Sequence, residues 1–345
     1  MKKKIVNAAA LATLATAGVA HAQSSVTMFG TIDVGIAHLT GENTSRTGVS
    51  TGGANISRIG WRGVEDLGGG LAASFWLEAG LNVDEGLGKA TGGGLSFNRR
   101  STVSLSSSSL GELRIGRDDS ATFLNTLIFD PFLTNGVGGT NAFVMQGSPI
   151  QISNAVSYFL PPGLGGFYGQ VQHVFGEAVK TTGMQNNNSG GYYGIRLGYQ
   201  SGPLNMAGAY GKLRGATEAA DVKIANAGAS YDFGIAKPML LLATEEVSGT
   251  KITAIEAGMT VPIGAGQVRA QVSRYNTNNS NADWTKFAIG YGYNLSKRTQ
   301  VYGTIAHVSN DSGSQRAISV QGLLSPGNTL GGGSGGYEVG IRHFF

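Results

Sequence analysis

The chain has 345 residues, and its composition is not that of an ordinary water-soluble domain. Charged residues make up 13%, against about 25% in typical soluble proteins, and the chain has 56 glycines and no cysteine. The net charge of +4 includes three lysines in residues 1–22, which hold no acidic residue, so 22 basic and 21 acidic residues remain beyond them. This near-neutral balance does not indicate nucleic-acid binding. Helical membrane spans are also excluded, because no later segment has 18 uninterrupted apolar residues.

Residues 1–22 have the pattern of a cleaved signal peptide. Three lysines at positions 2–4 precede an apolar stretch at 8–20, and Ala20-His21-Ala22 fits a small-x-small cleavage site. The mature chain is expected to begin at Gln23 and to be exported. Without disulfides, its stability must come from elsewhere, for example from a closed hydrogen-bonded sheet.

The mature chain reads as short strands in which apolar residues alternate with small or polar ones. At the C-terminal end, Tyr337, Val339 and Ile341 alternate with Glu338, Gly340 and Arg342. The same alternation of apolar with small or polar residues occurs in 71–81, 193–199 and 286–295. A period of two is typical of strands with one apolar and one polar face. Because the second face carries glycine and charge, it indicates a polar lumen.

Counting these segments predicts an all-β protein, a 16-stranded antiparallel transmembrane β-barrel. Connections alternate between short and long, and an even strand count places both termini on the periplasmic side. A closed sheet satisfies every backbone group in lipid. The predicted strands are 25–37, 54–65, 70–82, 96–106, 111–118, 151–160, 165–175, 190–200, 203–213, 222–233, 236–247, 250–261, 266–276, 282–295, 299–309 and 336–345.

The longest connection, residues 119–150, is too long for a simple turn. Its first part, 120–132, has apolar residues spaced as on a short helix, followed by glycines. Long connections without strands are usually functional or disordered, and this one is too apolar for disorder. We expect it to fold into the lumen.

Several stretches in this order resemble Gram-negative general diffusion porins, and the betaproteobacterial, neisserial-like branch in particular. The resemblance covers essentially the whole mature chain and implies a homotrimer in the bacterial outer membrane, with the third extracellular loop folded inward to narrow each pore. It is carried by residues 24–35, 57–80, 98–105, 111–117, 154–166, 294–302 and 340–345.

The resemblance also implies a cluster of arginines on the wall that faces the inward loop. Arg58 and the Arg99–Arg100 pair match these positions, and alternation places Arg58 and Arg62 together on the lumen side. For the pair, alternation favours Arg100 and the motif alignment favours Arg99, so both are retained as candidates for the basic side of the constriction.

A third arginine expected from the resemblance is replaced by Gln151, which removes one positive charge. Three acids in or beside the long connection, Asp118, Asp119 and Asp130, are candidates for an acidic loop side that would complete a transverse field. Asp130 has a second interpretation, because it precedes Pro131 and Asp-Pro pairs are common in turns.

The C-terminal Phe345 matches the family's signal for recognition by the barrel-assembly machinery. Tyr291, Tyr293 and Tyr337 are expected in the aromatic girdle at the membrane interface. No nucleophile–base, zinc or phosphate-loop motif occurs, so we expect no enzyme, no metal and no cofactor.

The sequence therefore predicts a passive, non-specific channel for ions and small hydrophilic solutes, embedded in outer-membrane lipid and weakly to moderately anion-selective. The main alternative is a substrate-specific channel on the same barrel, for which Phe123, Phe129, Phe132 and Phe143 could offer a stacking surface. A barrel enzyme and a structural or adhesive barrel are weaker alternatives, since the first lacks a catalytic pair and the second predicts a filled lumen.

Overall fold

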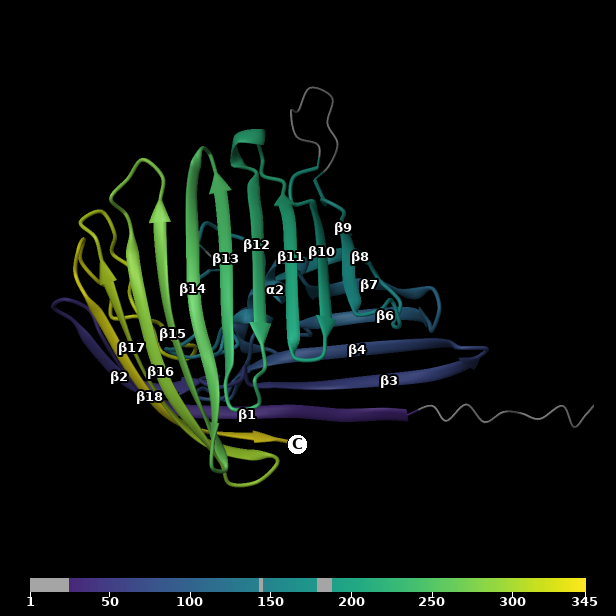
Figure 1. Cartoon of the computed structure of the whole chain (residues 1–345), viewed down its shortest axis with the longest axis horizontal. Helices are drawn as coiled ribbons and strands as arrows, with labels where there is room; N and C mark the ends of the chain where they lie inside the picture. Colours follow the sequence, from purple (N-terminus) through teal and green to yellow (C-terminus); the bar gives the residue numbers. More distant parts are fainter. Residues whose placement is uncertain (1–24, 143–144, 179–187) are drawn as a thin grey trace, which may run out of the picture.

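The computed structural model describes residues 25–142, 145–178 and 188–345, so the predicted signal peptide lies outside the described residues. The chain forms one antiparallel barrel (Figure 1). Its strand segments are β1 (Ser25–Thr40), β2 (Ser45–Thr51), β3 (Arg58–Gly68), β4 (Leu71–Asn82), β5 (Leu87–Gly88), β6 (Arg100–Ser107), β7 (Gly111–Asp119), β8 (Gln151–Phe159), β9 (Phe167–Val174), β10 (Tyr192–Ser201), β11 (Leu204–Leu213), β12 (Val222–Tyr231), β13 (Lys237–Val247), β14 (Thr250–Ile263), β15 (Gly266–Thr277), β16 (Trp284–Asn294), β17 (Thr299–Asn310) and β18 (Ser334–Phe344).

The eighteen segments make sixteen barrel strands. β2 and β3 pair with successive halves of β1 and together form the second strand, while the two-residue β5 pairs only with the end of β4. β18 pairs with β1 and closes the sheet, which leaves no free edge. In Figure 1 the strands of the near wall, β10–β14, cross those of the far wall, β3, β4 and β6, as the tilt of barrel strands requires. The predicted 16-stranded barrel is confirmed.

The second strand differs from the prediction, which began it at residue 54. It starts at Ser45, leaves the sheet after Thr51 and resumes at Arg58. The carboxylate of Asp33 accepts the backbone N–H groups of Ala54 (2.9 Å) and Asn55 (2.6 Å), which ties residues 52–57 to the lumen side. A polar side chain on the neighbouring strand β1, 21 residues before Ala54, thus holds the interruption of the strand in place.

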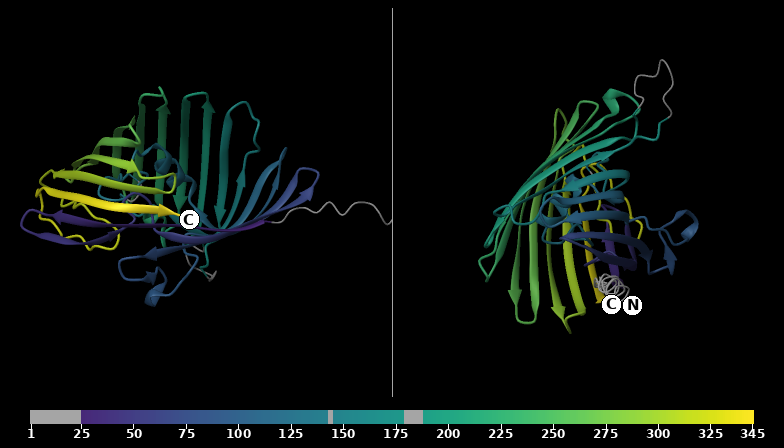
Figure 2. Two further views of the ribbon diagram at one scale, coloured as in Figure 1. Left: turned by 90° about the horizontal axis from the view of Figure 1, so that it is seen from below. Right: turned by 90° about the vertical axis from the view of Figure 1, so that its right-hand side faces the viewer.

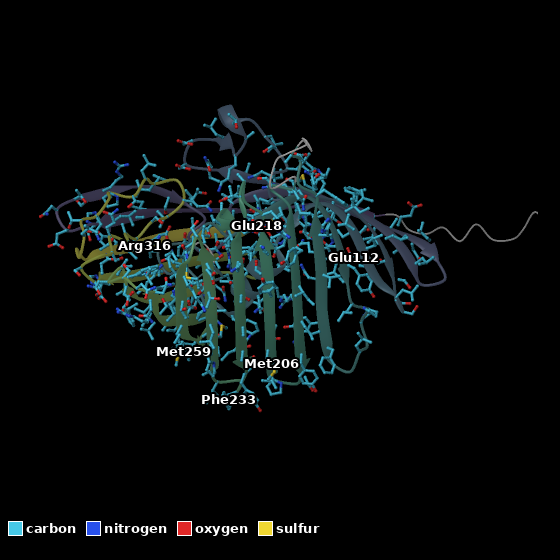
Figure 3. All side chains as sticks on the ribbon, turned by 90° about the horizontal axis from the view of Figure 1, so that it is seen from above. Glu112, Met206, Glu218, Phe233, Met259 and Arg316 are labelled. Carbon is cyan, nitrogen blue, oxygen red and sulfur yellow. The ribbon has the colours of Figure 1, made fainter. Side chains whose placement is uncertain are left out.

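The outer face of the barrel is apolar and the inner face is polar. Ile36 and Val339 are opposite each other on β1 and β18 and are each 63% exposed, whereas Asp33 and Glu338 on the alternate positions are buried in the interior. Figure 3 shows Met206, Phe233 and Met259 on the outer side of the wall, and all three are exposed. This arrangement suits a lipid surround and a hydrated lumen.

Three helices occur in the described chain: α2 (Ala121–Phe129), η1 (Thr91–Gly93) and η2 (Glu218–Ala220), none of them long and apolar enough to span a membrane. α2 begins the connection between β7 and β8, residues 120–150, which we call loop 3. It lies inside the barrel against β9–β13 (Figures 1 and 2). The predicted helical start of this connection is therefore present.

Loop 3 is seated on glycines of the wall. The hydroxyl of Ser120 accepts the N–H of Phe123 (3.1 Å) and so caps α2. Further along, the ring of Phe129 occupies the place where a side chain at Gly228 would lie, and Pro131 does the same at Gly258. Glycine on the inner face of β12 and β14 thus makes room for the loop.

Candidate functional site

A cavity of about 520 Å³ separates loop 3 from the inner wall formed by β3, β4, β6 and β7. We call it the constriction cavity. Its wall side carries four basic side chains, Arg58, Lys89, Arg99 and Arg100, and three acidic ones, Glu78, Asp118 and Asp119. Three of the four predicted arginines therefore line one cavity.

The arginines of this wall outnumber the carboxylates that hold them. Arg58 and Arg99 share one partner, Glu78, whose Oε1 lies 3.6 Å from Arg58 Nε and 2.6 Å from Arg99 Nε. Arg100 Nε lies 3.6 Å from Asp118 Oδ1. The three arginine side chains remain 22–24% exposed, so each guanidinium keeps a hydrated surface toward the cavity.

Both of the arginines that the sequence left open, Arg99 and Arg100, line the cavity. Arg100 is the first residue of β6, pairs with Glu78 of β4 and points inward by alternation. Arg99 has the opposite parity but lies just before the strand, where its N–H donates to the Glu78 carbonyl (3.2 Å). Its side chain is therefore free to turn to the same side.

Arg62 faces the lumen but does not line the constriction cavity, which corrects its predicted place. It lies four residues beyond Arg58, nearer the short-turn end of β3, with its guanidinium 5.2 Å from the ring of Trp76. Arg100 lies 4.5 Å from the same ring, so Trp76 stacks between two arginines. Arg114, which contacts the ring of Phe159 (4.1 Å), continues the basic wall on β7.

The predicted acidic loop side is not formed by the three acids proposed for it. Asp118 and Asp119 end β7 and therefore belong to the wall, beside the arginines. Asp118 accepts a hydrogen bond from Arg114 (2.6 Å). Asp118 has the inward parity of Arg114, whereas Asp119 has the opposite parity and still lines the cavity at the end of the strand, just past a β-bulge in the pairing with β8.

Asp130 belongs to loop 3 but is buried and points away from the cavity. Its carboxylate accepts the backbone N–H groups of Phe132 (2.9 Å), Thr134 (2.7 Å) and Thr140 (2.9 Å). Burial raises the pKa of this carboxyl, while the three N–H donors act in the opposite direction. The structure thus assigns it the turn-forming role that the Asp-Pro pair suggested, and this corrects its placement on the acidic side.

Gln151 lies at the cavity, at the start of β8. Its side-chain amide donates a hydrogen bond to Asp119 Oδ1 (2.7 Å). An arginine at position 151 would in addition neutralise the negative charge of Asp119. The missing charge is partly replaced by Lys89, from the connection between β5 and β6, whose ammonium donates to Gln321. Burial, aided by the nearby Arg99, lowers the pKa of Lys89.

Two charged wall residues, Glu78 and Lys89, were not predicted as site residues. Glu78 shares the inward parity of Ser74 and Trp76 in β4, so alternation could have identified it. Lys89 comes from an irregular connection, where no periodic signal exists. The loop side of the cavity is uncharged: among the described residues of loop 3 it is lined by Phe123, Leu127, Leu133, Thr134, Asn135 and Ile150.

A family model for Gram-negative porins matches residues 8–313. The chain belongs to this family. It is 37% identical to outer membrane porin protein 32 of Delftia acidovorans, over the full length of both chains, and 26% identical to major outer membrane protein P.IB of Neisseria meningitidis serogroup B, again over both full lengths. Among solved structures, an anion-selective porin from Comamonas acidovorans is similar, with 34% identity, a TM-score of 0.84 and coverage of 94% of this chain and all of that one.

These matches confirm the resemblance read from the sequence. The protein is an outer-membrane porin, a diffusion channel for ions and small hydrophilic solutes. Members of this family are channels rather than enzymes.

Proposed function

We propose that this porin favours anions over cations, and that the constriction cavity sets this preference. The observation that carries the proposal is the charge of the cavity lining, in which four basic side chains and three carboxylates share the wall side while the loop side is uncharged. A hydrated cluster of fixed positive charge raises the local concentration of anions. The similar porin of Comamonas acidovorans is anion-selective, which supports the same sign here.

The basic character continues below the cavity, toward the short turns. Arg62, Arg269 and Arg342 lie on inward positions of their strands, as does Arg114, which is paired with Glu112 (2.8 Å) and Asp118 (2.6 Å). An anion that passes the cavity therefore meets further guanidinium groups along the same route. Gln151 weakens the cluster without reversing its sign.

The test is reconstitution of the mature protein into a planar bilayer across a potassium chloride gradient. Stepwise conductance with a reversal potential displaced toward the chloride equilibrium potential is expected. The double variant Arg58→Gln/Arg99→Gln should move that potential toward zero, whereas Lys223→Gln, on the outer face of β12, should not. A neutral or cation-favouring potential in the unaltered protein would contradict the proposed selectivity.

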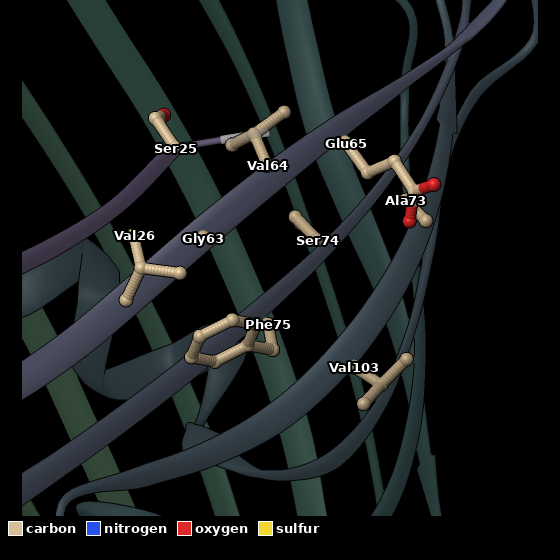
Figure 4. A pocket seen from close by; sticks show the side chains of 9 residues that line it. All are labelled: Ser25, Val26, Gly63, Val64, Glu65, Ala73, Ser74, Phe75 and Val103. Atoms are coloured by element: carbon tan, nitrogen blue, oxygen red, sulfur yellow. The ribbon is translucent and has the colours of Figure 1, made fainter. Parts of the chain in front are cut away.

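The homotrimer and the assembly signal are also proposals. The outer face of β1, β3, β4 and β6 has an apolar hollow of about 310 Å³, lined by Val26, Phe75 and Val103 among others (Figure 4), a surface suited to a second copy of the chain. Phe345 pairs through both backbone groups with Gly30 of β1 (3.1 and 3.2 Å), so the last residue takes part in closing the barrel. Cross-linking in native membranes tests the trimer, and deletion of Phe345 should lower the amount of assembled barrel.

A further inference from the structure

The loop side of the constriction cavity is uncharged and mostly apolar, although it faces water and a wall of arginines. Phe123 and Leu127 come from α2, and Leu133 comes from the turn that follows it. Leu133 is 37% exposed. A pore that carried only inorganic ions would gain nothing from apolar side chains at its narrow part, since these cannot replace the hydration of an ion.

The backbone holds Leu133 in this position at a conformational cost. Leu133 and Thr134 have φ angles of 54° and 62°, in the left-handed region that branched side chains avoid. Asp130 imposes this turn, because its carbonyl accepts the N–H of Leu133 (3.0 Å) and its carboxylate accepts that of Thr134 (2.7 Å). Strained residues at a lumen-facing position suggest a functional constraint on what is displayed there.

The two sides of the cavity together describe one kind of solute. Guanidinium groups bind carboxylates through paired, charge-assisted hydrogen bonds. The aromatic ring on the wall side, Trp76, lines the cavity but has the guanidinium groups of Arg62 and Arg100 over it, so the larger apolar contact surface for a solute in transit lies on the loop. A carboxylate attached to an apolar body satisfies both sides at once.

We propose that the constriction cavity transiently binds monocarboxylates with an apolar body, of the benzoate type, in preference to polar anions of the same charge and similar size. The carboxylate lies on Arg58, Arg99 and Arg100. The apolar body lies on Leu133 and Leu127. This inference rests on the proposed anion preference and adds a solute class to it.

The experiment measures block of the chloride current through single reconstituted channels by benzoate and, separately, by gluconate, a six-carbon polar monoanion. Benzoate should reach half-block at about a tenfold lower concentration. Leu133→Asn should raise the benzoate half-block concentration about fivefold, the size expected for losing one apolar side-chain contact, and leave gluconate unchanged. Asparagine tolerates the left-handed conformation, so the turn should be retained.

Leu127→Gln repeats the test on α2, where glutamine keeps helix propensity, and it decides the matter if the position 133 variant does not fold. The matched control is Leu164→Asn, an exposed leucine on the short turn between β8 and β9, outside the constriction cavity, which should behave as the unaltered porin. Equal block by benzoate and gluconate, or unchanged benzoate block in both loop variants, would overturn this inference and leave the anion preference intact. If the reversal potential of the unaltered protein did not favour anions, the proposed function itself would be overturned.

Discussion

Removal of the negative charge of Glu78 should increase anion selectivity. Glu78 is the shared partner of Arg58 and Arg99, at 3.6 and 2.6 Å, and lines the constriction cavity. In Glu78→Gln the remaining side-chain oxygen still accepts from Arg99 Nε, but the hydrogen bond that Trp76 Nε1 donates to the other carboxylate oxygen (3.2 Å) is lost together with the charge. The change therefore removes the charge while the side chain keeps its size and its bond to Arg99.

The size of the effect follows from Coulomb's law. A unit charge roughly 6–8 Å from a passing monovalent ion changes its energy by about 0.5–0.7 kcal/mol in water, and screening at 0.1 M salt reduces this by about half. Because the anion gains what the cation loses, the permeability ratio of chloride to potassium should rise about two- to fourfold. In 1 M salt the change should largely vanish, since the screening length falls to about 3 Å.

The assay is the reversal potential of single channels in a potassium chloride gradient of about 10:1, which separates the equilibrium potentials of chloride and potassium well. Glu246→Gln is the matched control, because Glu246 pairs with Lys223 on the outer face (2.9 Å) and its loss removes the same charge outside the lumen. If Glu78→Gln left the reversal potential unchanged, or moved it toward potassium, the wall charges would not govern selectivity and the reasoning would fail.

Three other changes test separate features of the pore. Gly228→Val should push against Phe129, destabilise the seated loop by about 1–3 kcal/mol and increase current noise, whereas Gly208→Val, with open space on the outer face, should not. Gln151→Arg should raise the chloride preference in reversal-potential measurements by about the same two- to fourfold as the loss of a negative charge does. Because burial lowers the pKa of Lys89, its ammonium should lose its proton as the pH rises, at a pH below the usual lysine pKa of about 10.4. The anion preference should fall over the same pH range, and Lys89→Arg should abolish this dependence on pH.

Each of these has a contradicting result. Equal noise in the two glycine variants would mean that the wall does not hold loop 3. An unchanged potential in the position 151 variant would mean that this end of β8 lies outside the ion path. An alkaline dependence that persists in Lys89→Arg would assign it to another group.

The sequence by itself determined the barrel and its polarity. Alternation with a period of two is a local property, so Val339 and Ile341 could be assigned to the lipid side, and Glu338 and Arg342 to the lumen, without knowledge of their neighbours. The same rule placed Arg58, Arg62 and Arg100 inward. The helical start of loop 3 was also readable, since its spacing of apolar residues is local.

Only the tertiary structure decided how the charges of the constriction are arranged. Arg99 escapes alternation because the chain has not yet entered the sheet, and Asp119 lines the cavity against its parity at the end of β7, beside an irregularity in the pairing with β8. The burial of Asp130, and with it the exposure of Leu133, depends on how loop 3 folds back on itself and on the glycines that receive it. Such features arise from contacts between segments far apart in the chain, and no local periodicity encodes them.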